Sequence, residues 1–109
     1  MLDKFDALND VDAKGNPLGG RVRGTGLLID WQDGPLGRGE NRQIPDGAFV
    51  ETVIAAAKQR IEFYQYVADG KFKCRENAMA ITKLDEALMW LQCRTQDRET
   101  RQVEGTQTA

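Results

Sequence analysis

The clearest pattern in the chain is a helical spacing of apolar residues in its second half. Over residues 47–69 the apolar positions recur every three or four residues, which places on one helix face Val50, Ile54, Ala57, Ile61 and Tyr64. Asp46 stands where an N-cap is expected, and Gly70 fits the left-handed position just beyond the helix end.

A second helix is predicted over residues 75–102, where the stripe consists of Asn77, Ile81, Leu84, Leu88 and Leu91. Because the link through residues 71–73 is short, the two helices should pack antiparallel as a hairpin. Two helices and a small sheet make a thin core, so we expect a symmetric dimer in which the hairpins cover each other's apolar faces.

The first half of the chain has the pattern of strands. Residues 25–32 are rich in β-branched, aliphatic and aromatic side chains, with Leu27, Ile29 and Trp31 on one face. Asp33, Gly34 and Pro35 indicate a turn, after which residues 36–43 could return as a second strand. The predicted fold class is α+β: a small N-terminal antiparallel β-sheet followed by a long antiparallel two-helix hairpin, assembling as a symmetric oligomer.

These elements predict one domain over residues 22–109, preceded by a flexible or loop-rich segment over 1–21. Within the domain we expect the β part at 22–45, the helical hairpin at 46–102 and a C-terminal tail at 103–109. Asp10 and Asp12 resemble the start of a calcium loop, but Lys14 and Arg21 stand where oxygen ligands are required. We therefore interpret this stretch as a solvated segment.

Composition excludes several classes of function. With 15 basic and 17 acidic residues the net charge is −2, which gives no bulk attraction to a DNA or RNA duplex or to a membrane surface. The chain has no histidine, so the commonest general base and zinc ligand is missing, and no metal or cofactor is expected. The glycines of GPLGRGENR lack the lysine of a phosphate-binding loop and are interpreted as turns.

The two cysteines, Cys74 and Cys93, both fall on the second predicted helix. Nineteen residues of helix separate them by about 28 Å, so they cannot pair within one chain and are expected to be reduced thiols.

Three arginines end the second helix on one face: Arg94, Arg98 and Arg101. Like charges one turn apart cost a helix about 0.2–0.5 kcal/mol per pair. Either a bound anion or exposure to water would offset this cost, and the spacing alone leaves both open. Asn77, on the apolar stripe, is equally open: its amide would bond to the helix backbone or offer a donor and an acceptor to a base edge.

The segment FKCRENAMAITKLDEALMWLQCRTQDRETRQVEGT, with GLLIDWQDGP and DGAFVETVI, resembles the phage Thoeris anti-defence sponge family of the first-described type. Its hairpin is also similar to that of the anti-CBASS sponges. The resemblance covers about residues 24–106, and the run RTQDR followed by R.VEGT is its most specific part.

The resemblance implies a non-enzymatic phage protein that acts in the cytoplasm of the infected bacterial host. Such proteins sequester glycocyclic ADP-ribose, so the host's Thoeris effector is never activated. They form homodimers whose pockets use both protomers. Some form hexamers that also hold cyclic oligonucleotides at separate sites.

On this basis Arg94 and Arg98 are expected to hold the pyrophosphate by forked hydrogen bonds, with Asp97 accepting from a ribose hydroxyl or orienting a partner's arginine. Asn77 is the expected reader of the adenine edge. Arg42 would lay its guanidinium on the base, and Phe72 would either stack on the ligand or fill the core below the hairpin.

Three further residues or groups carry weaker expectations. Arg101 is expected to pair with Asp97, and Trp90 to lie in the core or a dimer interface. Glu104, Gly105 and Thr106 are expected to form a turn whose backbone approaches the ligand. Two other classes compete with sequestration: an enzyme that degrades the nucleotide signal, and a helical-hairpin interaction protein with no ligand.

Overall fold

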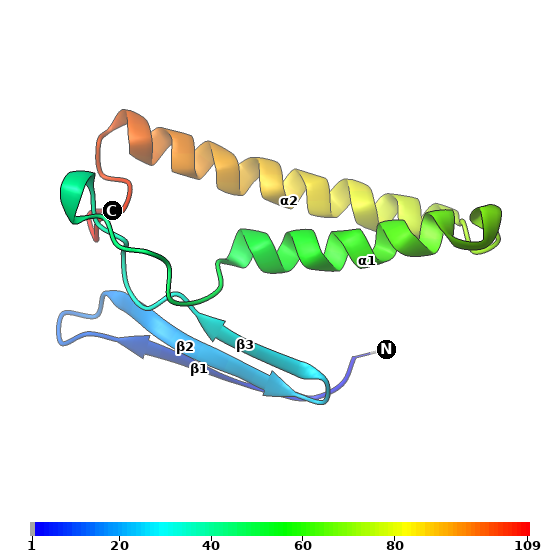
Figure 1. The fold of residues 1–109 in the computed structure, drawn as a ribbon, viewed down its shortest axis with the longest axis horizontal. Helices are drawn as coiled ribbons and strands as arrows, with labels where there is room; N and C mark the ends of the chain where they lie inside the picture. Colours follow the sequence, from blue (N-terminus) through cyan, green and yellow to red (C-terminus); the bar gives the residue numbers. More distant parts are fainter. Residues whose placement is uncertain (1) are drawn as a thin grey trace. The chain divides into compact units, whose positions relative to one another are not determined.

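The computed structural model describes residues 2–109 and contains three strands and two long helices (Figure 1). In chain order the elements are β1 (Phe5–Val11), β2 (Pro17–Gly24), β3 (Leu27–Trp31), the 3-10 helix η1 (Gly39–Asn41), α1 (Val50–Gly70) and α2 (Arg75–Thr100). This order confirms the predicted α+β class. The chain divides into two compact units, one formed by Met1–Phe49 with Arg98–Ala109 and the other by Val50–Asp97.

The sheet is antiparallel with strand order β1-β2-β3. The strand predicted over residues 25–32 is confirmed as β3, but its neighbour is β2, which precedes it, and not a strand that follows it. Gly24 pairs with Leu27, so only Thr25 and Gly26 form the connection. Gly26 has a φ of +69°, a conformation that a residue with a side chain adopts only at a cost.

The prediction of a loop-rich segment over residues 1–21 is wrong for β1 and for the start of β2. The side chains of β1 are exposed on both faces, and its backbone pairing with β2 holds it in place. Asp12 organises the turn between the two strands. Its Oδ1 accepts the backbone N–H of Lys14 at 2.8 Å and of Asn16 at 2.9 Å. The N–H of Asn16 is the main cause of the lowered pKa of this carboxyl.

The second strand predicted over residues 36–43 is also wrong. This stretch folds back on itself, with the N–H of Gln43 donating to the carbonyl of Leu36 at 2.7 Å, and contains η1. Gly37 and Gly39 have φ values of +89° and +64°, which are incompatible with a regular strand.

α1 begins at Val50, three residues later than predicted, and Asp46 does not cap it. Instead Asp46 Oδ1 accepts the backbone N–H of Asp33 at 2.9 Å. Ala48 pairs with the edge of β3, because its N–H donates to the carbonyl of Asp30 at 2.7 Å and its carbonyl accepts the N–H of Gln32 at 2.9 Å. The chain is therefore still extended at the position where the sequence pattern suggests a helix.

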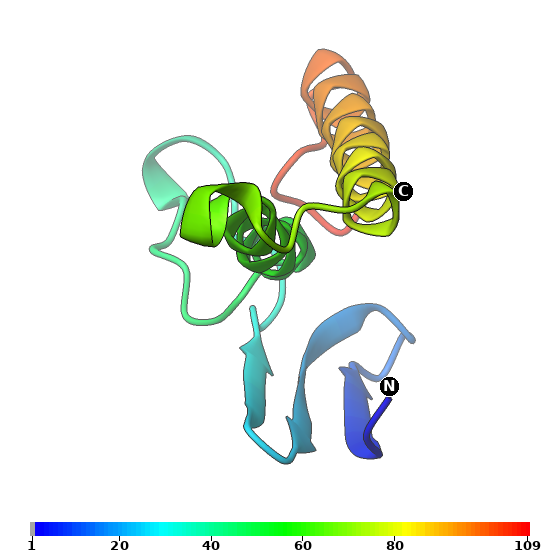
Figure 2. The same ribbon diagram turned by 90° about the vertical axis from the view of Figure 1, so that its right-hand side faces the viewer.

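The second unit is the predicted antiparallel helical hairpin, seen from two directions in Figures 1 and 2. Gly70 has the predicted positive φ of 81°, but the left-handed backbone already starts at Ala68, with a φ of +53°. Gln65 is 5% exposed and closes the link: its Nε2 donates to the carbonyl of Cys74 at 3.2 Å, and its Oε1 accepts the N–H of Cys74 at 2.9 Å. Lys58 and Asp85 pair at 2.7 Å between the helices.

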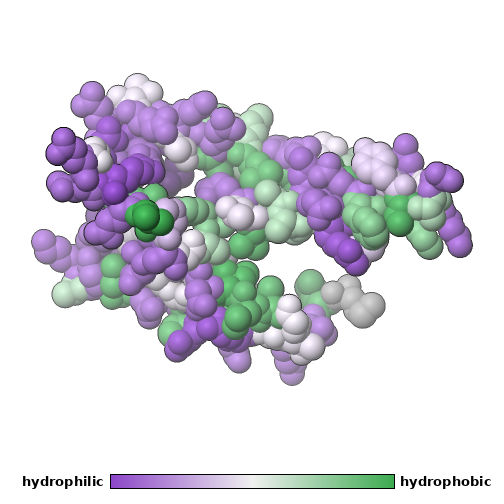
Figure 3. All heavy atoms as spheres, in the orientation of Figure 1, coloured by the Kyte–Doolittle hydropathy of each residue, from purple (hydrophilic) through white to green (hydrophobic). Residues whose placement is uncertain are grey.

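Little of the apolar surface is covered within a single chain. Among residues 2–109, Val22 is the only hydrophobic residue that is buried. Large hydrophobic side chains stay exposed along the hairpin: Phe63, Tyr64, Tyr66, Phe72, Met79, Met89 and Trp90. The face drawn in Figure 3 shows hydrophobic residues at the surface among hydrophilic ones. With exposures of 57% and 63%, Phe72 and Trp90 do not lie in a core of the single chain, so the core interpretation is wrong for both, and the dimer-interface alternative for Trp90 stays a prediction. Both cysteines are free and exposed. No described helix is both long enough and apolar enough to cross a membrane.

Candidate functional site

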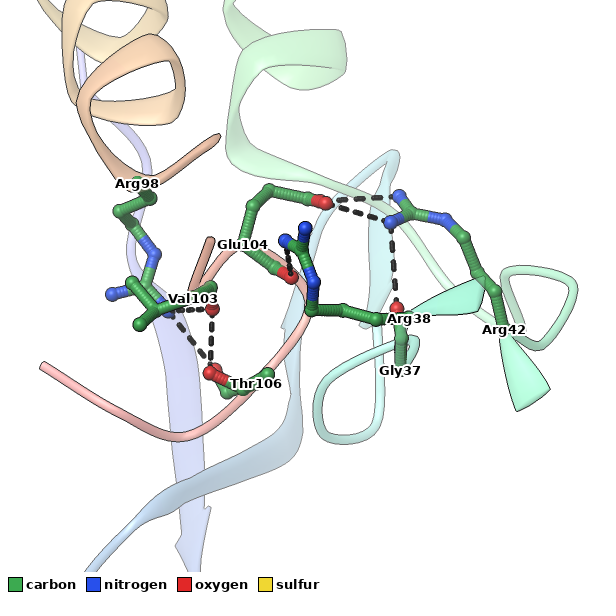
Figure 4. Close-up of polar contacts among 7 residues, drawn as sticks. All are labelled: Gly37, Arg38, Arg42, Arg98, Val103, Glu104 and Thr106. Atoms are coloured by element: carbon green, nitrogen blue, oxygen red, sulfur yellow. Dashed lines mark hydrogen bonds and ion pairs between the residues drawn. The ribbon is translucent and has the colours of Figure 1, made fainter. Parts of the chain in front are cut away.

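Three arginines hold residues 103–106, the first part of the tail, as Figure 4 shows. The most buried of them is Arg98, which is 9% exposed. Its Nη1 donates to the carbonyls of Thr108 at 2.6 Å and Ala109 at 3.1 Å, and its Nη2 donates to those of Val103 at 3.1 Å and Thr106 at 3.0 Å. A guanidinium has five N–H donors. Four backbone oxygens of the tail therefore use most of the hydrogen-bonding capacity of Arg98.

Arg42 and Arg38 hold the same segment through Glu104. The carboxylate of Glu104 accepts a forked pair of bonds from Arg42, at 2.7 Å from Nη1 and 3.1 Å from Nη2. Arg38 Nη1 donates to the backbone carbonyl of Glu104 at 2.9 Å. The hydrogen bond from Arg42 lowers the pKa of Glu104 most, and the charges of Arg42, Arg38 and Arg98 lower it further. In return, the bond to Glu104 raises the pKa of Arg42.

Two glycines let the backbones of the loop and the tail touch. The N–H of Gly37 donates to the carbonyl of Gly105 at 2.8 Å. Gly105 has a φ of +79°, and a Cβ there would lie 2.3 Å from the carbonyl oxygen of Gly37. The expected turn at Glu104, Gly105 and Thr106 is present in the structure. Only a glycine can occupy its centre at this distance.

Residues 26–96 match the family model described as Acb2/Tad1, hairpin domain. The chain belongs to this family. A protein of Bacillus phage SBSphiJ7 named Thoeris anti-defense 1 is 48% identical over 78 residues, which are 72% of this chain and 50% of the relative. The chain thus spans half the length of the curated relative it matches. The resemblance to the Thoeris anti-defence sponges is confirmed.

The part of the chain that matches the hairpin domain contains four of the six predicted ligand residues: Arg42, Phe72, Asn77 and Arg94. Asp97 and Arg98 follow just beyond it. Arg94 is exposed one turn before Arg98 on α2, and Asp97 is exposed beside it in sequence. Asn77 is partly buried in the first turn of α2, and its backbone N–H lies 3.4 Å from the Sγ of Cys74.

Of the predicted residues, the structure brings Arg42 and Arg98 to one segment, the tail. Phe72, Asn77, Arg94 and Asp97 belong to the other compact unit, the hairpin. Phe72 follows Lys71, whose Nζ lies 5.3 Å from the centre of the Phe72 ring.

Sequence reasoning missed Arg38 and the carboxylate of Glu104. Arg38 is 66 residues from its partner Glu104, and Glu104 is 62 residues from its partner Arg42, so no local spacing predicts either contact. The one signal present was the run of glycines around Arg38, which was interpreted only as turns. All three glycines of that run, Gly34, Gly37 and Gly39, adopt a positive φ, which lets the loop that carries Arg38 and Arg42 follow the tail.

Proposed function

We propose that this member of the Acb2/Tad1 hairpin family binds glycocyclic ADP-ribose and sequesters it without cleaving it. Sequestration would keep the host's Thoeris effector inactive in the cytoplasm of an infected bacterium. The observation that carries the proposal is the family match over residues 26–96, together with the name of the phage relative. The absence of histidine from the sequence favours binding over hydrolysis, since it removes the commonest general base.

Within this proposal Arg94 is the primary ligand for the diphosphate. It is exposed on α2, whereas Arg98 already donates to four carbonyls of the tail. Arg98 would reach the ligand only by exchanging some of those carbonyls for phosphate oxygens. A charged phosphate oxygen is a stronger acceptor than a peptide carbonyl, so such an exchange is favourable in enthalpy.

The other predicted residues complete the proposed site. Asp97 would accept from a ribose hydroxyl. Asn77 lies about 25 Å from Arg94 along α2, so Asn77 would read the adenine edge, and the nearby Phe72 would stack on the ligand, from the second protomer. Arg42 would lay its guanidinium plane on the base. The 57% exposure of Phe72 supports a contact outside the single-chain core.

We also propose a homodimer with pockets formed by both protomers. The support is the apolar surface left open on the hairpin, including Trp90 at 63% and Met89 at 50% exposed. A chain that buries so little apolar surface alone gains stability from a second copy. Native mass spectrometry of the free protein distinguishes monomer, dimer and hexamer directly.

The test of sequestration is an incubation with glycocyclic ADP-ribose, removal of the free ligand by ultrafiltration, denaturation, and chromatography of what is released. Recovery of unchanged ligand in proportion to protein supports the proposal. A converted product would instead show an enzyme. If the protein neither depletes the ligand from solution nor shows a higher melting temperature with it, the chain is better described as a helical-hairpin interaction protein with no ligand. A cyclic oligonucleotide in the same assay tests the alternative of a separate site for such ligands.

The residue-level test is Arg94→Ala, which should lose about 2–5 kcal/mol of binding free energy, the range for removing one partner of a buried charge pair. Lys83→Ala is the matched control, because Lys83 is a surface cation on the same helix, 3.7 Å from Glu86. Equal dissociation constants for Arg94→Ala and Lys83→Ala would reject the proposed position of the diphosphate.

A further inference from the structure

The pair Arg42 and Glu104 has a feature that a simple surface ion pair lacks. Both terminal nitrogens of Arg42 donate to the two oxygens of one carboxylate, so the guanidinium is fixed in a plane and not only in position. The Nη1 atom also lies 3.4 Å from the carbonyl of Gly37. The side chain of Arg42 nevertheless remains 42% exposed, while that of Glu104 is 23% exposed.

Glu104 is itself held by contacts that do not involve its carboxylate. Its carbonyl accepts from Arg38, and its N–H donates to the carbonyl of Arg98 at 3.2 Å. The neighbouring residues are held as well, since Val103 accepts from Arg98 and Gly105 from the N–H of Gly37. The tail does not need the fork of Arg42 to stay in place, and an exposed ion pair adds little to stability.

An arginine whose fork is occupied can no longer grip a phosphate by two parallel bonds, because those donors are already used. Its flat faces remain able to stack on a planar, electron-rich ring. A side chain that is fixed before binding also loses less conformational freedom when the ligand arrives.

We propose that Glu104 is a positioning residue that holds the guanidinium of Arg42 flat for stacking on the nucleobase of the ligand. This inference rests on the proposed function. It takes the placement of Arg42 on the base from that proposal, and it adds for Glu104 a role in affinity without contact with the ligand.

The experiment measures dissociation constants for glycocyclic ADP-ribose with the full chain and with Glu104→Gln, Arg42→Ala and the double variant. Glutamine keeps the shape of Glu104 but removes its charge and one of its two acceptors. We expect Glu104→Gln to weaken binding about three- to tenfold, the effect of leaving one long side chain unfixed. In the Arg42→Ala background the same change should have no further effect.

Other outcomes overturn the proposal. Tighter binding by Glu104→Gln would show that the carboxylate competes with the ligand for Arg42. An unchanged dissociation constant for Glu104→Gln would show that Glu104 has no role in binding. An equal loss of affinity in the wild-type and Arg42→Ala backgrounds would show that Glu104 acts independently of Arg42. Arg42→Lys keeps the positive charge but removes the planar guanidinium. This variant should bind as weakly as Arg42→Ala, and wild-type affinity would reject stacking.

Asp30→Asn is the matched control, because Asp30 forms an ion pair with Arg23 at 3.0 Å within the sheet, apart from the tail. It should leave the dissociation constant unchanged. Hydrogen exchange of the Gly37 and Val103 amides in Glu104→Gln checks that the tail stays in place. If the wild-type protein itself does not bind glycocyclic ADP-ribose, the proposed function fails and this inference with it. If it binds and only the variants behave otherwise, the inference alone fails.

Discussion

Replacing Gly105 with alanine should release the tail from the loop that carries Arg38 and Arg42. The added Cβ would lie 2.3 Å from the carbonyl oxygen of Gly37, a distance that real Cβ atoms do not reach. Both sides of the contact are backbone, so no side-chain rotation can relieve it. The two backbones must separate, and the hydrogen bond from the Gly37 N–H to the Gly105 carbonyl, now 2.8 Å long, is lost with them.

The expected cost has two parts. A residue with a Cβ in the left-handed region costs about 1–2 kcal/mol, and Gly105 has a φ of +79°. The lost backbone hydrogen bond adds about 0.5–1.5 kcal/mol. The free energy of opening the tail should therefore fall by about 1.5–3.5 kcal/mol, the sum of the two effects.

Gly15→Ala is a close control for the backbone part. Gly15 has a φ of +81° in the turn between β1 and β2, and a Cβ there meets no atom within 4 Å. The Gly15→Ala variant therefore has the free-energy cost of a left-handed alanine but no steric clash. Amide hydrogen exchange is the assay: Gly105→Ala should remove protection from the Gly37 and Val103 amides, while Gly15→Ala leaves both unchanged. Equal protection of the Gly37 amide in the wild type and Gly105→Ala would refute the reasoning.

Two further predictions concern the link of the hairpin and the pH range of the tail. Gln65→Leu leaves the N–H and carbonyl of Cys74 without their buried partner, so unfolding of the hairpin should become easier by about 1–3 kcal/mol in a denaturant titration. The exposed Gln59→Leu on the same helix should have little effect, and equal midpoints would contradict the assigned role. The pKa of Glu104 is lowered in the folded state, so its contribution is present above its ordinary value of 4.5 and is lost as the pH falls through the lowered value. The protection factors of the tail amides should therefore decrease only slightly as the pH falls below 4.5, because the backbone contacts of Glu104 remain, and Glu104→Gln should lack this step.

The sequence predicts those elements whose signal is local. Residues 25–32 read as a strand because their own side chains favour one, and β3 forms there. The two helical stripes likewise give α1 and α2 to within three residues at each end. β1 was missed because its apolar alternation is short: Phe5 and Ala7 are followed by the polar Asn9 and by an irregularity before Val11. Its strand conformation comes from pairing with β2 along nearly its whole length.

Errors at the helix start have the same physical origin. Asp46 is a good N-cap by residue type, yet its carboxylate accepts the N–H of Asp33 instead. The sheet edge of β3 competes for the following backbone, because Ala48 pairs with it before the helix can begin. Local preference is overridden here by contacts with residues 13 to 18 positions earlier, which no spacing rule describes.

The candidate site was predictable only as far as helix geometry reaches. The spacing places Arg94, Arg98 and Arg101 on one face, and from this alone they seem to share one role. The structure gives them different surroundings: Arg94 is exposed, Arg98 is enclosed by four carbonyls, and Arg101 donates to the carbonyl of Ala109 at 3.0 Å.

These surroundings supply an answer that the sequence pattern did not include. Backbone oxygens of the tail accept from Arg98 and so offset part of its charge. The position near the helix C-terminus adds to this, since a cation is favoured at the negative end of the helix dipole. The carbonyl of Arg98 in turn accepts the N–H of Val103 at 2.9 Å and so closes the helix end. The same residue thus ends α2 and fixes the tail that carries Glu104. A change at Arg98 would therefore disturb the tail even if the guanidinium never touched a ligand, so Arg94 gives the cleaner test of the proposed diphosphate contact.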